Sequence, residues 1–253
     1  MTWFPLVNPI VVLEAHCDDA CLSIGGTLSI LKELGAEIQI INIFSSCATT
    51  VLRTIKGDYE AITRLNRQEE KEYARKLGAN LAFLEFQEAL LRGHKRWTCR
   101  GLSTSDQNLV PKIRSAIESL LGNRTVTIFS PLAVGNHRDH MIVRAATQML
   151  SKNPSNSRLI YYEDLPYGYF DRFYDAGVRR ATSLVQHNVS PILIPISMHE
   201  KYGVMRIYKS QYNAVDLRPT IRYGQYVHQK YLDKSSTPTS AAERLWLRPD
   251  QVF

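Results

Sequence analysis

Two clusters of histidine and aspartate stand far apart in the chain. The first reads His16-Cys-Asp18-Asp19 and the second reads His137-Arg-Asp139-His140. Each follows an apolar run that is typical of a strand. Imidazole nitrogens and carboxylate oxygens are the ligands of catalytic zinc sites, in which three protein ligands leave one position for water. If both clusters meet at one edge of a sheet, they can carry out metal-assisted hydrolysis.

The spacing within each cluster suggests a role for each side chain. His16, Asp19 and His140 are the expected metal ligands, and the metal would lower the pKa of water towards ~7. Adjacent side chains on an extended backbone point apart, so Asp18 can face that water as the general base. His137 shares a helix face with His140 and could stabilise the oxyanion, then protonate the leaving amine.

Other interpretations of these residues stay open. Asp139 could hold an imidazole by a hydrogen bond from outside the ligand set, whereas Asp18 and Asp139 could also be simple helix caps. Glu163 and Asp164 end a predicted strand and could reach the same edge, or could cap the chain before Pro166. Nitrogen and oxygen ligands suit Zn²⁺ but would also accept Fe²⁺ or Co²⁺.

The elements that must position these clusters alternate along the chain. Strands are expected at 10–15, 37–45, 80–86, 125–130, 158–163 and 191–197. Helices are expected at about 26–35, 60–77, 108–121, 138–151 and 198–213. This alternation predicts an α/β fold with a mostly parallel sheet, whose ligands bind beyond the carboxyl ends of the strands. Residues 88–107 are polar and glycine-containing, which predicts a long functional loop.

Composition narrows the class of protein. The chain has 253 residues, 44% of them hydrophobic, and no linker, which favours a single domain over residues 1–253. No apolar run approaches the ~20 residues of a membrane span, and no signal peptide is visible, so we expect a cytoplasmic protein. The net charge of +7 is scattered without a nucleic-acid-binding signature, so no nucleic-acid partner is expected. Whether the chain forms a homo-oligomer stays open.

The four cysteines do not have the spacing of a zinc ribbon. Cys17 and Cys21 could pair in a disulfide across the first cluster, but reduced thiols are favoured in a cytoplasmic protein.

Several motifs resemble those of the LmbE-like/PIG-L family of zinc-dependent N-acetylglucosaminyl deacetylases. The family signature Ala-His-Pro-Asp-Asp-Glu followed by Gly-Gly is similar to residues 15–20 with Gly25-Gly26, and the family His-x-Asp-His is similar to residues 137–140. An Arg-x-x-Glu helix is present at residues 67–70. Two departures are Cys17 in place of proline and Ala20 in place of glutamate.

The resemblance implies a Rossmann-like three-layer fold, a zinc ion, and hydrolysis of an N-acetyl group from an amino sugar or its conjugate. It implies that His16, Asp19 and His140 bind the metal, that Asp18 is the general base, and that His137 is the acid or the oxyanion partner. By position it also implies substrate contacts from Arg67 and Glu88. Variation at Cys17 and Ala20 fits relatives from antibiotic and other specialised-metabolite pathways.

Two alternatives remain beside deacetylation. One is a related amidase that cleaves a larger acyl group or a thiol-conjugate amide. The other is a non-catalytic relative that binds a sugar or nucleic acid on the same scaffold. Metal content would separate the enzyme from the binding protein.

Overall fold

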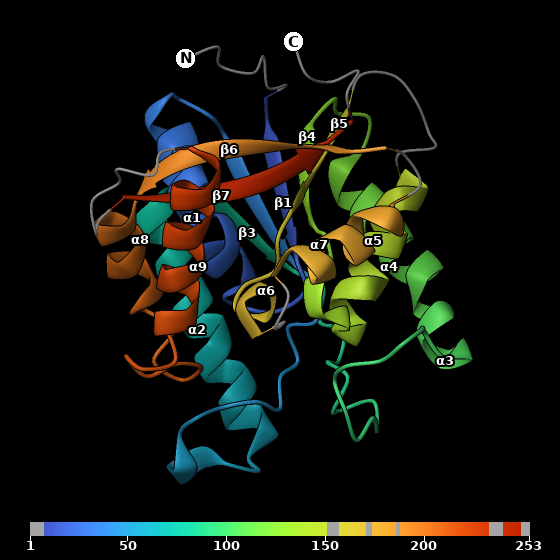
Figure 1. The fold of residues 1–253 in the computed structure, drawn as a ribbon. Coiled ribbons are helices and arrows are strands. Elements are labelled where there is room, and N and C mark those ends of the chain that lie inside the picture. The colour runs from blue at the N-terminus through green and yellow to red at the C-terminus, as the bar shows by residue number, and fades with distance from the viewer. Residues whose placement is uncertain (1–7, 151–156, 171–173, 186–187, 233–239, 249–253) are drawn as a thin grey trace.

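A seven-stranded sheet forms the centre of the computed structural model, which describes residues 8–150, 157–170, 174–185, 188–232 and 240–248 (Figure 1). The strand order is β3-β2-β1-β4-β5-β7-β6. The strands are β1 (Ile10–Glu14), β2 (Ile38–Asn42), β3 (Asn80–Phe83), β4 (Thr127–Pro131), β5 (Arg158–Tyr162), β6 (Ser190–Ser197) and β7 (Ser240–Leu247). Neighbours among β1 to β5 pair in parallel, whereas β7 is antiparallel to both β5 and β6. The expected α/β fold with a mostly parallel sheet is confirmed.

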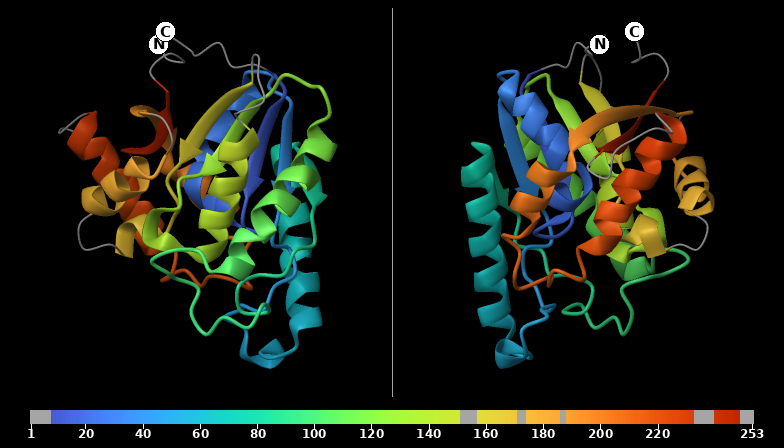
Figure 2. Two further views of the ribbon diagram at one scale, coloured as in Figure 1. Left: turned by 90° about the vertical axis from the view of Figure 1, so that its right-hand side faces the viewer. Right: turned by 60° about the vertical axis from the view of Figure 1, so that its left-hand side comes forward.

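Helices cover both faces of this sheet and make a three-layer molecule (Figures 1 and 2). On one face lie α1 (Asp19–Glu33), α2 (Tyr59–Leu77), α8 (Met198–Met205) and α9 (Arg218–Tyr231). On the other lie α4 (Leu109–Leu121), α5 (Arg138–Leu150) and α7 (Tyr174–Ser183). Shorter segments are η1 (Arg53–Ile55), α3 (Thr104–Gln107), η2 (Val134–Asn136) and α6 (Tyr167–Phe170).

The side chains of the central strand β1 point alternately to the two faces of the sheet, which explains why a hydrophobic core lies on each face. Val11 and Leu13 of β1 pack with α4 and α5, whereas Ile10 and Val12 pack with α1 and α2. Successive side chains of a strand point to opposite faces, so a continuous apolar strand serves a core on each side. This is why β1 is fully buried and can hold the residues that follow it in place.

Two expected helices have different bounds in the structure. The helix expected at 26–35 begins at Asp19, directly after the first cluster, and a non-helical residue, Ile24 (φ −134°), lies within it. The helix expected at 198–213 ends at Met205. α1 is kinked at Ile24, directly before Gly25-Gly26, and Glu243 accepts the backbone N–H groups of Gly26 and Thr27 that follow the kink.

Strand β7 and helix α9 are not anticipated by the sequence pattern. Glu243 and Arg244 stand in the middle of β7 and make it look polar, yet both are buried. Lys201 pairs with Glu243 at 2.7 Å, and Glu163 pairs with Arg244 at 2.5 Å. Buried charges are tolerated when they are paired and hydrogen-bonded, and here the partners come from distant parts of the chain.

The topology brings the two His/Asp clusters together. β1 and β4 are neighbours, but their chains continue to helices on opposite faces of the sheet, α1 and α5. Ligands of open α/β sheets bind where the strand order reverses in this way, beyond the carboxyl ends. His16 follows β1 and His137 follows β4 and η2. Within the described residues, no helix has the length and apolarity needed to cross a membrane.

Candidate metal centre and its cavity

The turn after β1 places the first cluster. The Asp19 carboxylate accepts the backbone N–H of His16 at 2.8 Å, and α1 begins at Asp19 itself. Asp18 precedes the helix with φ 108°, a conformation that L residues rarely adopt. Such strain is retained where surrounding contacts impose it, commonly at functional sites. Here the backbone N–H of Asp18 donates to Glu70 Oε2 at 3.1 Å.

Three atoms from both clusters form a compact triangle. His140 Nε2 lies 3.3 Å from His16 Nδ1 and 3.4 Å from Asp19 Oδ2, and His16 Nδ1 lies 3.6 Å from Asp19 Oδ2. Tetrahedral zinc with bonds of about 2.0–2.1 Å requires its ligands to be about 3.3–3.4 Å apart. The spacing of these three donors therefore fits a zinc ion.

Carboxylates outside the triangle orient both of its imidazoles. Asp139 Oδ2 lies 3.0 Å from His16 Nε2, and Asp164 Oδ1 lies 2.5 Å from His140 Nδ1. Each ring thus uses one nitrogen on a carboxylate and turns the other towards the centre. This arrangement is usual for histidines that bind metal.

The electrostatics also fit a cation. Burial lowers the pKa of His16, but the hydrogen bond to Asp139 and the charge of Asp19 raise it to about 10. Burial likewise opposes protonation of His140, yet Asp19 and Asp164 raise its pKa. The buried carboxylates therefore attract positive charge to these rings, and a divalent ion can supply that charge in place of protons.

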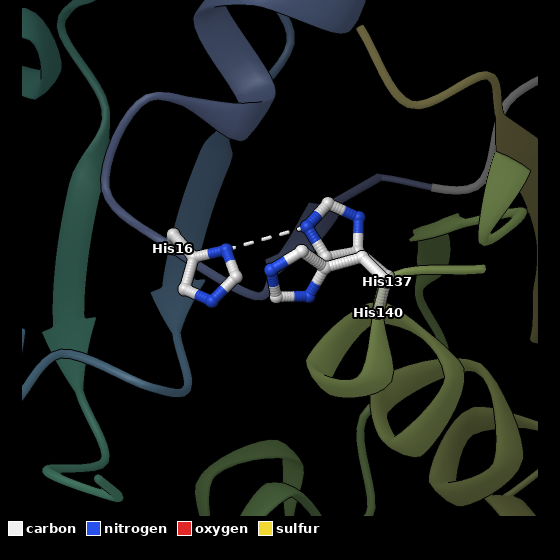
Figure 3. A group of neighbouring side chains, drawn as sticks. All are labelled: His16, His137 and His140. Carbon is white, nitrogen blue, oxygen red and sulfur yellow. Dashed lines mark hydrogen bonds between the residues drawn. The ribbon is translucent and has the colours of Figure 1, made fainter. Parts of the chain in front are cut away.

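His137 is the third imidazole of the centre (Figure 3). Its nearest ring nitrogen and those of His16 and His140 lie within 4.8 Å of one another, so a three-histidine ligand set is also available. The Nδ1 atom of His137 accepts the backbone N–H of Asp139 at 3.2 Å, which leaves the proton of the neutral ring on Nε2. Burial and the two other imidazoles hold the pKa of His137 well below its ordinary value.

Asp18 does not behave as a helix cap. Its side chain accepts no hydrogen bond from the first turn of α1, although it stands at the N-cap position. It lines the cavity next to the metal centre and is only 5% exposed. Burial and the neighbouring Asp19 carboxylate raise its pKa well above the ordinary range. A carboxylate of raised pKa facing a cavity is suited to accept a proton.

A cavity of about 270 Å³ opens beside the centre. Glu88 lines it and accepts hydrogen bonds from Ala48 N and Thr49 Oγ1. Arg67, by contrast, is not among the lining residues. Its guanidinium donates to Ser45 and Glu85, so the structure gives it a role in joining α2 to the loops after β2 and β3.

The structure separates the roles of two adjacent acidic residues and adds one aromatic residue to the site. Asp164 orients His140, whereas Glu163 beside it turns away to Arg244, Tyr223 and Trp246. The position of Glu163 and Asp164 at the end of a predicted strand marked both as candidates, but it could not tell which of them reaches the metal centre.

Trp97 stacks on His137 at 5.3 Å between ring centroids and an interplanar angle of 18°, and it lines the cavity. No periodic pattern marks it, because it belongs to the irregular loop before α3.

Comparison with known proteins gives one family and several relatives. The family described as "PIG-L: GlcNAc-PI de-N-acetylase" matches residues 11–150, more than half of the chain. The 2'-N-acetylparomamine deacetylase of Streptomyces fradiae is 27% identical over 220 residues, which cover 85% of this chain and 77% of that protein.

Solved structures share the fold. The A40926 pseudoaglycone deacetylase superimposes with a TM-score of 0.71 at 21% identity and covers 95% of this chain and 96% of its own. A zinc-inhibited form of teicoplanin deacetylase gives a TM-score of 0.72 at 18% identity and covers 94% of this chain and 97% of its own. At these identities the likeness establishes the Rossmann-like three-layer architecture.

Proposed function

Because the chain belongs to the PIG-L family, whose match includes both His/Asp clusters, we propose that it is a zinc-dependent N-deacetylase of amino sugars or their conjugates. The observation that carries the proposal is the triangle of His16, Asp19 and His140 with donor separations of 3.3–3.6 Å. Relatives that deacetylate 2'-N-acetylparomamine and the A40926 pseudoaglycone support a substrate from an antibiotic pathway.

His16 Nδ1, Asp19 Oδ2 and His140 Nε2 are the proposed ligands. A zinc ion held there would supply a Lewis acid that activates water at neutral pH. Asp139 and Asp164 keep the two rings turned towards the ion and raise their basicity. The same donors would also accept Fe²⁺ or Co²⁺. We therefore propose a divalent-metal site in general and zinc as its metal in particular.

Asp18 is the proposed general base. Its strained backbone directs the side chain to the cavity, where the carboxylate takes a proton from the water that attacks the amide carbonyl. The hydrogen bond from Asp18 N–H to Glu70 keeps this conformation in place.

His137 is the proposed partner of the oxyanion. Its Nδ1 is occupied by a backbone N–H, so the neutral ring presents Nε2–H, which can donate to the oxygen of the tetrahedral intermediate. This hydrogen bond favours the stabilising role over proton donation to the leaving amine, because a neutral ring has only this proton to give.

The cavity wall suits a sugar. The indole of Trp97 is 45% exposed and offers an apolar face, while Glu88 and Gln211 offer polar atoms for hydroxyl groups. The contact from Glu88 and the single-domain, cytoplasmic organisation remain predictions.

The test is a panel of N-acetylated amino sugars, including 2'-N-acetylparomamine and glycopeptide pseudoaglycones, scored for free amine and acetate with the zinc-loaded protein. We expect turnover of at least one member, and Asp18→Ala should abolish it while about one zinc per chain stays bound. Near-full activity of Asp18→Ala would refute the assignment of the base. Absence of bound metal and of acetate release would refute the function and favour the non-catalytic alternative.

A further inference from the structure

Two cysteines come together at the carboxyl ends of neighbouring strands. The parallel pairing of β1 and β2 continues past their last residues, since Phe44 N–H donates to Ala15 O at 2.8 Å. Cys17 follows this pair by two residues and Cys47 by three. The topology therefore brings the two thiols to the same wall of one cavity, where each side chain affects the pKa of the other.

Both thiols belong to the wall of the cavity described above. Cys17 stands between His16 and Asp18 in the chain, and all three line that cavity together with Cys47. Cys17 and Cys47 are only 3% and 2% exposed, and the cavity that they line is the route by which a small reagent would reach them.

The other two thiols lie in different surroundings and provide internal comparisons. Cys21 is fully buried in α1 within the apolar core, and Cys99 contacts Met141 Sδ at 3.8 Å away from the cavity lining. All four cysteines are free thiols in this structure.

We propose that Cys17 and Cys47 form a modification site, at which a peroxide converts the pair into a disulfide that reversibly switches off the neighbouring centre. The Cys47 thiolate attacks one peroxide oxygen, the O–O bond breaks, and the departing hydroxide takes a proton to become water. Cys17 then attacks the Cys47 sulfenic sulfur, the S–S bond forms and a second water leaves. In sum, two thiols and one hydrogen peroxide give one disulfide and two waters, with sulfur oxidised and oxygen reduced.

The surroundings of Cys47 support its place as the attacking thiol. The neighbouring Cys17 and Asn66 side chains lower the pKa of Cys47, in spite of its burial. The thiolate is the form that peroxide oxidises.

The consequence for the centre follows from geometry. A disulfide brings two sulfurs to about 2.05 Å, much closer than two free thiols can approach. Drawing Cys17 towards Cys47 pulls on the backbone between His16 and Asp18, which already has φ 108° at Asp18. A displacement of about 1 Å in a catalytic group can cost about 100-fold in rate. Activity should therefore fall when the bond forms and return when it is reduced.

The experiment treats the full chain with hydrogen peroxide, with and without added zinc, and then with a thiol reductant. Mass spectrometry should show loss of two hydrogen atoms per chain and a crosslink between the peptides that contain Cys17 and Cys47. Deacetylation should drop by about 10- to 100-fold and recover on reduction. Cys47→Ala should keep its own starting activity after peroxide, whereas Cys99→Ser should lose activity as the unaltered protein does.

Three results would overturn the proposal: no Cys17–Cys47 crosslink under peroxide, a crosslinked protein of unchanged activity, or a reversible loss in Cys47→Ala equal to that of the unaltered protein. The crosslink is measured by mass, so it is decided even if no substrate of the panel is turned over. Failure of this proposal and failure of the deacetylase assignment are therefore distinguishable.

Discussion

Asp139 Oδ2 lies 3.0 Å from His16 Nε2, so a residue of α5 fixes the ring orientation of a residue that follows β1. The same oxygen accepts the backbone N–H of Ala89, and Oδ1 accepts Arg92. One buried carboxylate thus joins the metal centre to the loop that forms a wall of the cavity. A substitution that breaks the contact of Asp139 with His16 should therefore also disturb its contacts with Ala89 and Arg92, and the reverse.

The first prediction concerns this carboxylate. Asp139→Asn removes its charge and weakens its hold on His16, so zinc affinity should fall by about 10- to 100-fold. Competition with a chromophoric chelator measures the zinc affinity. Asp164→Asn is the matched variant on the other ring and should give a loss of similar size. Unchanged affinity in both variants would show that the carboxylates do not support the metal ligands.

The second prediction concerns Trp97. Trp97→Ala removes the exposed indole that we propose packs on the sugar, and the loss of an aromatic contact of about 0.5–1.5 kcal/mol should raise KM by about two- to tenfold. Trp97→Phe keeps an aromatic face and should recover most of the loss. Steady-state kinetics on the best substrate separates KM from kcat. A fall in kcat with unchanged KM would instead assign Trp97 to the positioning of His137.

The third prediction concerns pH and the buried Glu70. Burial raises the pKa of Glu70 from 4.5 to about 7, so the folded state binds a proton more tightly than the unfolded state does. Its contribution to stability is complete below pH about 4.5 and is lost as the pH rises through 7, with a size on the order of 3 kcal/mol.

Urea unfolding of the metal-free protein from pH 5 to 8 measures this effect. Glu70→Gln cannot ionise and should have a flatter profile than the unaltered protein. Glu72→Gln changes an exposed carboxylate on the same helix and serves as the control. Parallel pH profiles for the unaltered protein and Glu70→Gln would contradict the prediction.

The fourth prediction compares two adjacent glycines of α1. A Cβ at Gly26 would lie 2.7 Å from Ile196 Cγ2, whereas one at Gly25 would lie 3.7 Å from its nearest neighbour, the Tyr73 hydroxyl. Gly26→Ala should therefore destabilise the fold by about 1–3 kcal/mol, while Gly25→Ala should be tolerated. Thermal unfolding measures both. Adding Ile196→Ala to Gly26→Ala should relieve the overlap, and equal losses at the two glycines would rule out this explanation.

The clusters were recognisable in the sequence because their chemistry is local. His16, Asp18 and Asp19 lie within four residues, as do His137 and His140, and each group follows an apolar strand. Alternating strand and helix patterns also predicted the parallel sheet, since burial on both faces leaves long β-branched runs. Those runs determined that the clusters would lie at one edge.

Contacts between side chains that are distant in the sequence could not be predicted in this way. No sequence pattern announces that the Arg67 guanidinium donates to Ser45 and Glu85, and the substrate contact expected of Arg67 stays a prediction. Strand β7 looked polar because its buried charges find partners at Lys201 and Glu163, far away in the chain. Pairing of this kind depends on which side chains meet after folding.

The sequence by itself determined the fold class and the candidate donor atoms, because periodicity and residue type are properties of short segments. Tertiary structure alone decided which nitrogen of each imidazole faces the centre, that Asp164 rather than Glu163 orients His140, and that Cys17 meets Cys47. These outcomes depend on separations of a few ångströms between atoms that strand order, and not chain order, makes neighbours.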